Sequence, residues 1–403
     1  MTYQSERINT PVSTKELERR WAAVRAAMQE HRIDVLLMQN NNDQVGGYVK
    51  YFTDLPATFA FQVTVAFPLN DGMTMICQGA FGGDQHLPPE GDGLRRGIKR
   101  FMTTSSFASA SYSLAYDAKL AEKALEPYAR GTVGLVGPGT LPISLIDRLK
   151  RGKLSTAKFV DASDIVDRIK AVKSEEEISL IRRTAAVQDA AMEIAFAAVK
   201  PGKREIEIAA VAECAVVERG GEQGLYLCSS TPGADSGGQP AWQANRHLQN
   251  RLLREGDVFT LLIESNGPGG MYTELGRTCV LGKAPQQLKE EFAFLLEARN
   301  HTMNQVAPGA SCKEIWDSHN QFMRKHGKPE ERRMYCHSQG YDVMERPFVR
   351  FDEPMLIQKN LNIACHPNYL TERFFVSITD NYLIGEMGVR ERLHKFPEMM
   401  VEL

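Results

Sequence analysis

The stretch over residues 256–281 constrains the fold most, because its pattern predicts two β-strands joined by a tight turn. Residues 258–263 are apolar and rich in strand formers, and residues 271–280 resume the strand pattern. The residues between them, 266–270, read Asn-Gly-Pro-Gly-Gly, and these types tolerate positive φ or preset a turn. The sequence therefore predicts a β-hairpin at this point of the chain.

Each strand of this predicted hairpin carries one acid among apolar neighbours, Glu264 on the first strand and Glu274 on the second. A hairpin can bring the two carboxylates close together inside a sheet. Burying two like charges is costly unless a cation, a proton or a substrate group compensates them. Two interpretations follow: a functional pair of acids, or two solvent-facing glutamates at the edge of a sheet.

The composition predicts a globular protein of two or three domains, since 43% of the 403 residues are hydrophobic and 24% are charged. The net charge of −2 argues against nucleic acid or an anionic membrane as a partner. Seven cysteines without a CxxC motif favour reduced thiols, and the polar N-terminus does not resemble a signal peptide. No apolar run approaches ~20 residues, so we expect a cytoplasmic protein without a transmembrane helix.

The first 165 residues alternate between predicted strands and helices, which is typical of an α/β domain. A junction over residues 161–174 leads into a helix over residues 175–199, which begins with acids in its first turn. We therefore predict an N-terminal domain over residues 1–165 and a C-terminal domain over residues 166–403.

A Pro-Gly pair occurs twice in the C-terminal domain, at residues 201–202 and 308–309. Each pair follows a long amphipathic helix and precedes another helix, which favours an internal duplication, although Pro-Gly also ends helices by itself. Four strand-like segments then lie between residues 335 and 384. Strands that gather after helices predict an α+β domain in which helices cover one face of a mostly antiparallel sheet.

Further polar or ionisable residues stand outside the hairpin, most of them in strand-like segments. They are His337, Glu345 and His366, with Asn245 and His247 shortly before the hairpin. A single histidine on a strand is usually structural. A pair of histidines with a pair of glutamates can bind a first-row divalent metal ion, or form an acid–base site without metal. No two of these residues stand at a diagnostic spacing such as HExxH, so the residues leave both interpretations open.

Four segments resemble the creatinase/prolidase/aminopeptidase P family. The family's linker helix is similar to VKSEEEISLIRRTA at residues 172–185, and the strand after its Arg-x-Leu-x-x-Gly-Asp turn is similar to LLREGDVFTLLIE at 252–264. Its Asp-x-x-Arg-Thr segment resembles TELGRT at 273–278, and its His-Gly-x-Gly-x-x-x-His-Glu-x-Pro segment resembles HSQGYDVMERP at 337–347. The resemblance covers nearly the whole chain.

This resemblance implies the fold class: a smaller α/β creatinase-type N-terminal domain, and an α+β pita-bread catalytic domain built from a pseudo-twofold duplication. It also implies a homodimer in which the small domain of one subunit borders the site of the other. The aromatic loop over residues 52–61 is the candidate contributor, with Phe59 and Phe61 as substrate-binding candidates.

The resemblance fails at the metal ligands of the family's metallopeptidases, which bind two ions through two aspartates, one histidine and two glutamates. The aspartates fall at Leu262 and Glu274 here, and the histidine is kept as His337. The glutamates fall at His366 and Thr379. Two ions need several anionic oxygens to balance four positive charges, so a dinuclear peptidase site is not expected.

The pattern is closer to the metal-free branch of the family, such as creatinase and ectoine hydrolase, which open C–N bonds in small molecules. It does not match creatinase itself, whose glutamate before Arg-Thr is Gly276 here and whose catalytic histidine aligns with Asn245.

We therefore predict a metal-independent hydrolase, without a cofactor, of a C–N bond in a small polar compound such as an amidine, urea, lactam or amide. The predicted catalytic residues are Glu264, Glu274, His337, His366 and Glu345, the last of which orients His337 or forms a structural salt bridge with Arg277 or Arg346. The predicted substrate-binding residues are His247, Asn245, Tyr272, Phe59, Phe61 and Thr379.

Two alternatives belong to other classes. The first is a hydrolase, peptidase or lyase with a single Zn, Fe or Mn ion bound by Glu264, Glu274, His337 and His366. The second is a pseudo-enzyme that binds peptides without turning them over.

Overall fold

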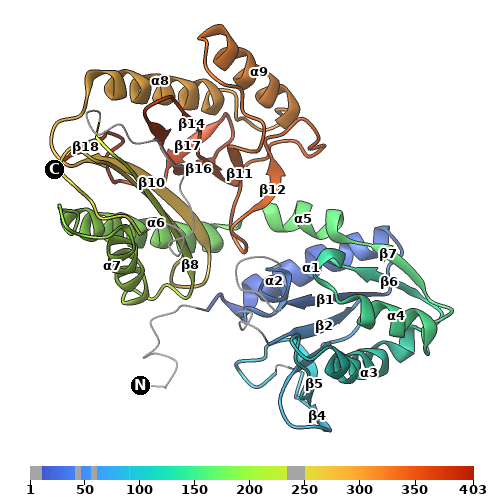
Figure 1. Ribbon diagram of the computed structural model, residues 1–403. Coiled ribbons are helices and arrows are strands. Elements are labelled where there is room, and N and C mark those ends of the chain that lie inside the picture. The colour runs from blue at the N-terminus through green and yellow to red at the C-terminus, as the bar shows by residue number, and fades with distance from the viewer. Residues whose placement is uncertain (1–10, 41–46, 56–60, 90, 234–249) are drawn as a thin grey trace. The chain divides into compact units, whose positions relative to one another are not determined.

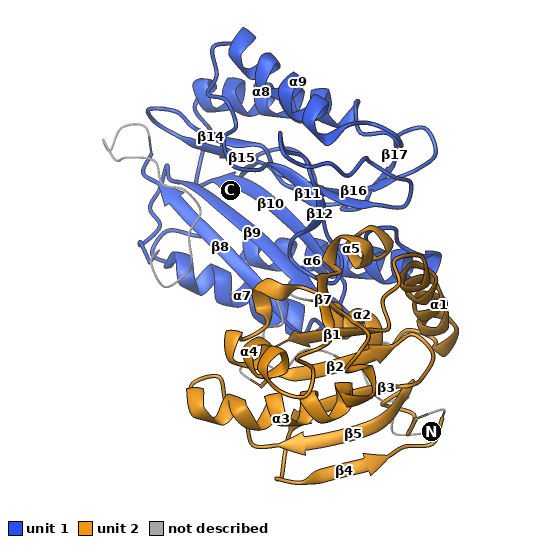
Figure 2. Cartoon of the chain, turned by 90° about the vertical axis from the view of Figure 1, so that its right-hand side faces the viewer, with its two compact units in different colours: residues 1–10, 171–403 blue, residues 11–170 orange. Residues whose placement is uncertain are grey.

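The computed structural model describes residues 11–40, 47–55, 61–89, 91–233 and 250–403. Within them the chain forms two compact units, residues 11–170 and residues 171–403 (Figure 2). The boundary between the units falls at the C-terminal end of helix α5 (Ser163–Ala171), and the predicted domain boundary after residue 165 lies in the same helix. No helix in the described ranges has the length and apolarity that crossing a membrane requires.

The N-terminal unit is built on a seven-stranded mixed sheet in the order β4-β5-β3-β2-β1-β6-β7. Its strands are β1 (Val35–Asn40), β2 (Val63–Pro68), β3 (Met73–Gln78), β4 (Gly83–His86), β5 (Ile98–Thr104), β6 (Thr132–Leu135) and β7 (Lys158–Asp161). Its helices are α1 (Thr14–Glu30), α2 (Tyr48–Thr53), α3 (Leu114–Leu125), α4 (Ile143–Arg151) and α5. The alternation of strands and helices confirms the predicted α/β class.

One buried acid in this unit gives a stability prediction. Asp117 on α3 accepts hydrogen bonds from Gln39 Nε2 at 2.9 Å and from Thr64 Oγ1 at 3.0 Å. Burial nevertheless raises the pKa of the Asp117 carboxyl to about 6. The unfolded chain therefore releases this proton at lower pH than the folded chain does, so Asp117 lowers stability increasingly as the pH rises from about 4 to about 6.

We expect Asp117→Asn to stabilise the protein by about 1–3 kcal/mol at pH 8 and by much less at pH 4. The new amide oxygen can still accept from Gln39 Nε2 and Thr64 Oγ1, while the side chain no longer carries a charge whose burial is costly. Urea unfolding of both proteins across this pH range measures the difference. Asp147→Asn, on an exposed aspartate of α4, is the control. A stability difference that does not change with pH would contradict the prediction.

The C-terminal unit stacks two sheets between pairs of helices (Figure 1). One sheet has the order β18-β10-β9-β8 and the other the order β12-β11-β13-β16-β17, with a separate hairpin of β14 and β15. The strands are β8 (Gly224–Thr231), β9 (Val258–Asn266), β10 (Tyr272–Val280), β11 (Cys336–Ser338), β12 (Glu345–Phe348), β13 (Asn362–Cys365), β14 (Asn368–Leu370), β15 (Phe375–Ser377), β16 (Asp380–Ile384), β17 (Val389–Arg392) and β18 (Val401–Glu402).

The helices of this unit follow the predicted repeat. They are α6 (Glu175–Ala197), α7 (Glu205–Val217), α8 (Gln286–Met303) and α9 (Cys312–Lys325). Each Pro-Gly pair lies between the two helices of a pair, and each helix pair is followed by strands, as a duplicated unit requires. Helix α6 begins with a capping box, in which Ser174 and Glu177 satisfy each other's backbone N–H groups.

The predicted hairpin is confirmed as β9 and β10, paired antiparallel in a register that sets Glu264 directly opposite Glu274. Both strands lie inside the four-stranded sheet, with β8 and β18 on either side. The core beneath is made by apolar residues of this sheet together with α6 and α7, among them Phe196, Ile208 and Phe259. The interpretation of the two glutamates as solvent-facing residues of an edge strand is therefore wrong.

Candidate functional site

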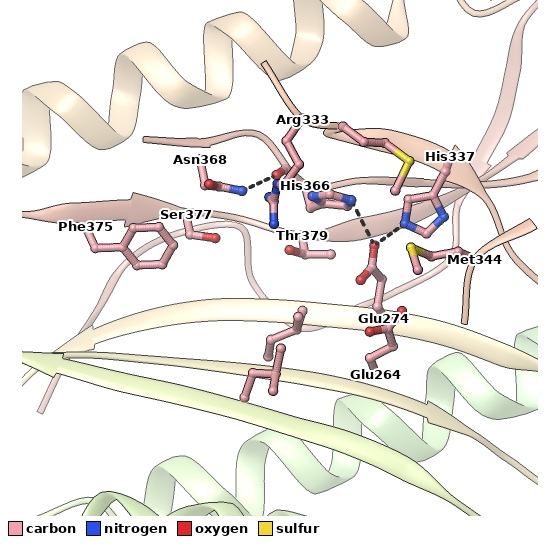
Figure 3. Close-up of a pocket in the computed structure, with 13 residues that line it drawn as sticks. Glu264, Glu274, Arg333, His337, Met344, His366, Asn368, Phe375, Ser377 and Thr379 are labelled. Carbon is pink, nitrogen blue, oxygen red and sulfur yellow. Dashed lines mark hydrogen bonds and ion pairs between the residues drawn. The ribbon is translucent and has the colours of Figure 1, made fainter. Parts of the chain in front are cut away.

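A cavity of about 290 Å³ lies in the C-terminal unit, between the β9–β10 hairpin and the other sheet (Figure 3). Four of the predicted catalytic residues line it, although they come from segments far apart in the sequence. These are Glu264 and Glu274 from the hairpin, His337 from β11, and His366 from the segment after β13. Antiparallel pairing of β11 with β13 brings the two histidines together.

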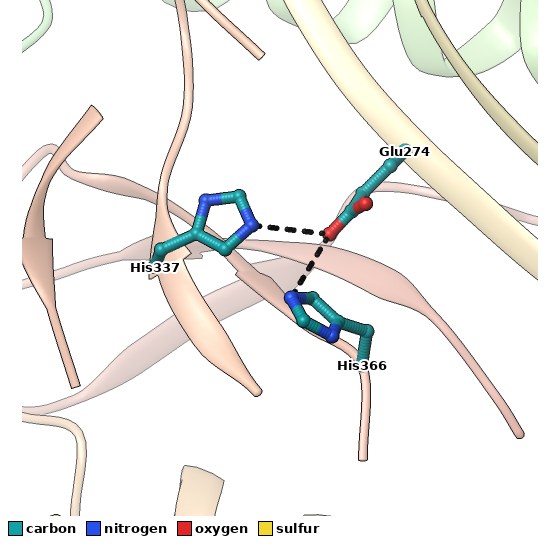
Figure 4. Close-up of side chains that lie close together, drawn as sticks. All are labelled: Glu274, His337 and His366. Carbon is teal, nitrogen blue, oxygen red and sulfur yellow. Dashed lines mark ion pairs between the residues drawn. The ribbon is translucent and has the colours of Figure 1, made fainter. Parts of the chain in front are cut away.

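Three of these side chains converge on one point (Figure 4). Glu274 Oε1 lies 3.6 Å from His337 Nε2 and 3.9 Å from His366 Nε2. One potential ligand atom from each of the three residues lies within 4.8 Å of the others. We call Glu274, His337 and His366 the triad. Two imidazoles and one carboxylate form a ligand set that suits iron, manganese or zinc.

The tautomer of His337 is set by its neighbour. The Nδ1 atom lies 2.9 Å from the Ser338 carbonyl oxygen, which can only accept, so Nδ1 carries the proton and Nε2 presents its lone pair toward Glu274. Burial lowers the pKa of His337 to about 4 and holds the pKa of His366 well below its usual value. Both rings are therefore neutral near pH 7, which is the form that binds a metal ion.

Glu274 is a buried carboxylate with no hydrogen bond to one of its two oxygens among the described residues. Its side chain is 4% exposed, and Oε1 has no hydrogen-bond partner among the described residues. Burial raises the pKa of Glu274 well above its usual value, and the charge of Glu264 adds to this effect. An unpaired buried acceptor that faces the lone pair of His337 Nε2 has no donor there to compensate its burial. A cation at this point would satisfy all three atoms, so the residues present fit one metal ion.

Glu264 is held apart from the triad by a residue that sequence reasoning missed. Gln339 Nε2 donates to Glu264 Oε1 at 2.8 Å and to the Val343 carbonyl at 2.8 Å. Asn381 Nδ2 in turn donates to Gln339 Oε1 at 2.9 Å, and Asn381 Oδ1 accepts from the Glu274 backbone N–H at 2.7 Å. Burial raises the pKa of Glu264 to about 8. Gln339 stands two residues after His337, but the sequence around it does not indicate that its amide contacts Glu264.

Glu345 has structural partners. Its Oε2 lies 2.6 Å from Lys173 Nζ, and its Oε1 accepts from the Tyr341 backbone N–H at 2.7 Å. Both charged side chains are almost fully buried. Of the two arginines suggested from the sequence, Arg277 pairs with Asp380 and Arg346 pairs with Glu353.

The remaining predicted residues fall in three groups. Thr379 lines the cavity, as does Leu262, whose apolar side chain cannot bind a metal ion. Tyr272 is buried in β10 and is not among the described cavity residues, and Phe61 belongs to the N-terminal unit, where its ring meets Phe107. Asn245, His247 and Phe59 lie outside the described residues. The cavity also contains Arg333, Asn368 and Ser377, which sequence reasoning missed, together with Leu227, Met344 and Phe375.

Comparisons with known proteins agree with the fold. The model of metallopeptidase family M24 matches residues 179–386. The Xaa-Pro dipeptidase of Pyrococcus furiosus is 23% identical over 257 residues, which make up 62% of this chain and 71% of that protein. The solved structure of dipeptidase PepE from Mycobacterium ulcerans matches with a TM-score of 0.75 at 19% identity, covering 98% of this chain and 99% of that chain. The X-Pro aminopeptidase from Thermotoga maritima matches with a TM-score of 0.74 at 18% identity, covering 95% and 99%.

These similarities confirm the predicted pita-bread fold and contradict the predicted function. A metal-independent hydrolase without a cofactor is wrong, because the matching family is one of metallopeptidases and the matching relatives carry dipeptidase names. The relatives named above do not support a placement near creatinase and ectoine hydrolase. The prediction was wrong because it considered only the negative charge that two ions need. Leu262 and Thr379 stand where the family's metallopeptidases have carboxylate ligands, so those two ligands are lost. The triad still has enough ligand atoms for one ion.

Proposed function

Because the chain belongs to metallopeptidase family M24, we propose that it is a metal-dependent hydrolase of dipeptides that works with one divalent metal ion instead of two. The relatives named Xaa-Pro dipeptidase support an Xaa-Pro peptide as the substrate class. The observation that carries the proposal is Glu274 Oε1, a buried carboxylate oxygen without a hydrogen-bond partner that faces two imidazole nitrogens. The predicted homodimer and the predicted small-molecule substrate remain predictions.

Glu274, His337 and His366 would hold the ion. When bound, it would supply a Lewis acid that polarises the carbonyl of the scissile bond. The tautomer of His337, set by the Ser338 carbonyl, keeps one ring nitrogen available as a ligand without any rearrangement. Neutral imidazoles bring no repulsion to a cation, so the two lowered histidine pKa values favour binding near pH 7.

Glu264 would handle the proton in peptide hydrolysis. The raised pKa of Glu264 would fall beside the positive charge of a bound ion, so its carboxylate would stay ionised. Gln339 holds one carboxylate oxygen, which leaves the other to take a proton from the water that attacks the carbonyl carbon. As the C–N bond breaks, the same carboxyl would return that proton to the leaving nitrogen. Leu262 and Leu227 also line the cavity and would help to exclude bulk water from these groups.

The test of this proposal is metal removal from the purified protein. We expect about one ion per chain by mass spectrometry of the metal content, loss of Ala-Pro hydrolysis on dialysis against a chelator, and recovery when Mn²⁺, Fe²⁺ or Zn²⁺ is added back. A urea and an amidine substrate are the controls and should not be cleaved. Full dipeptidase activity in metal-free protein, or two ions per chain, would contradict the proposal.

A further inference from the structure

Three buried amide side chains contact one another next to the cavity. They are Gln339, which follows β11, Asn362 on β13 and Asn381 on β16, and all three are fully buried. None of them is among the described residues that line the cavity. Two of the amides instead bond to Glu264 and Glu274, which both line it (Figure 3). The amides can therefore influence chemistry in the cavity through the way they hold these two glutamates.

The orientation of the Asn381 amide follows from a main-chain group that can only donate. The backbone N–H of Glu274 donates to Asn381 Oδ1 at 2.7 Å. Asn381 Nδ2 therefore points the other way, where it donates to Gln339 Oε1 at 2.9 Å and to Asn362 Oδ1 at 3.0 Å. Exchanging the oxygen and the nitrogen of this amide would set N–H against N–H on one side and oxygen against oxygen on the other.

The other two amides are held in matching orientations by carbonyl groups, which can only accept. Asn362 Nδ2 donates to the carbonyl oxygens of Tyr272 and Gln339, each at 3.2 Å. Gln339 Nε2 donates to the Val343 carbonyl oxygen at 2.8 Å, and the same nitrogen donates to Glu264 Oε1 at 2.8 Å. Every polar atom of the three amide groups thus has a partner, as buried polar atoms require.

The backbone of Asn381 is held on both sides. Asn381 pairs with Ala364 of the neighbouring strand β13. Its N–H donates to His394 Nδ1 at 3.3 Å, and its carbonyl oxygen accepts from the Leu393 N–H at 2.9 Å. Gln339 lies in the connection between β11 and β12, where residues 339–344 form neither strand nor helix. The side chain of Asn381 therefore starts from a fixed strand position and reaches toward a loop.

We propose that Asn381 is a positioning residue for the reaction: it fixes the amide of Gln339, which in turn holds Glu264 Oε1 so that the second carboxylate oxygen serves the cavity. The catalytic consequence rests on the proposed function. The same side chain holds the backbone of Glu274, so one residue sets the proposed metal ligand and the proton acceptor relative to each other. Both must act on one water molecule, and a displacement of about 1 Å can cost about 100-fold in rate.

The variant Asn381→Asp separates the two contacts of this side chain. An aspartate keeps an oxygen for the Glu274 N–H but has no N–H for Gln339, so a carboxylate oxygen would face the Gln339 oxygen. We expect the variant to keep its bound metal and to change KM for Ala-Pro by less than about 3-fold, while kcat falls by about 10- to 100-fold. Gln339→Met should lower kcat to a similar extent, because it removes the donor to Glu264.

Asn320→Asp is the matched control, because the buried Asn320 of α9 has the same kind of contacts and does not line the cavity. Its Oδ1 accepts from the Glu331 N–H at 2.8 Å, and its Nδ2 donates to the Glu331 carbonyl oxygen at 3.1 Å. This variant should lower stability and leave kcat unchanged. Adding Asn381→Asp to Gln339→Met should lower kcat further by less than about 3-fold, since Asn381 acts through Gln339. Unchanged kcat in Asn381→Asp, or independent losses in the double variant, would overturn the inference.

A structural test separates this inference from the proposed function and needs neither turnover nor a variant that folds. Neutron diffraction from crystals of the perdeuterated wild type locates the deuterons of each amide, which fixes its orientation. We expect both amide deuterons of Gln339 on the atom that faces Glu264, and those of Asn381 on the atom that faces Gln339. That result in a protein that cleaves no dipeptide would support the positioning of Glu264 while the proposed function fails. The reverse orientation of Gln339 would overturn the inference even if dipeptides are cleaved.

Discussion

Replacing Glu274 with glutamine is expected to abolish stoichiometric metal binding and to lower kcat/KM for Ala-Pro by about 1,000-fold or more. Glu274 supplies the negative charge of the triad, and its Oε1 lies between His337 Nε2 and His366 Nε2. Glutamine keeps the shape of the side chain but presents a neutral oxygen or an N–H group. The ion would then have no negatively charged ligand in the triad, only two neutral imidazoles. Metal content and dipeptide turnover of the purified variant, each relative to wild type, give the measurement.

Two further variants make this result specific. Glu264→Gln should keep about one ion per chain and still lose most turnover, because Glu264 is bound by Gln339 and stands outside the triad. Glu297→Gln, on an exposed glutamate of α8, should keep both metal and activity. If Glu274→Gln retained one tightly bound ion, Glu274 would not be a ligand and the proposed site would be wrong.

The largest expected effect on stability comes from Asp380→Asn, which should destabilise the protein by about 3–5 kcal/mol. Asp380 is fully buried at the start of β16 and pairs with Arg277 Nη2 at 2.8 Å, Arg392 Nη1 at 3.1 Å and Arg299 Nη1 at 3.4 Å. Removing its charge leaves these guanidinium groups with less compensation, and the Arg277 side chain is itself fully buried.

Denaturant unfolding of the metal-free wild type and variant measures this effect without a contribution from ligand binding. Asp317→Asn is the matched control, because Asp317 pairs with Lys313 on the exposed face of α9 and should change stability little. A loss below about 1 kcal/mol in Asp380→Asn would show that the arginines find other partners. Since Thr379 lines the cavity and directly precedes Asp380, a weakened β16 should also lower dipeptide affinity.

Sequence reasoning succeeded where a feature depends on residues close together in the chain. The hairpin at β9 and β10 followed from strand formers around a Gly-rich turn, and its confirmed register sets Glu264 against Glu274. The start of α6 followed from Ser174 and the acids after it, which form the expected capping box. The repeated Pro-Gly pairs likewise marked the two helix pairs of a duplicated domain.

The site itself was predicted as a set of residues but not as an arrangement. That Glu274, His337 and His366 converge while Glu264 is held aside by Gln339 depends on how β9, β10, β11 and β13 pair across a wide span of sequence. The prediction of a metal-independent enzyme failed for this reason. Charged residues can be counted from a sequence, but whether three ligand atoms lie close enough to bind one ion depends on the tertiary structure. Arg333 escaped notice because nothing in its local sequence distinguishes it from Arg332.

By itself the sequence determined the local elements, the duplication and the identity of four ionisable residues in the cavity, because these follow from periodicity, turn chemistry and residue type over short stretches. The tertiary structure alone decided which of the four share a point, which tautomer His337 adopts and which cation faces the cavity. The physical reason is that distance, burial and the loss of a hydrogen-bond partner exist only after segments up to about a hundred residues apart have packed together.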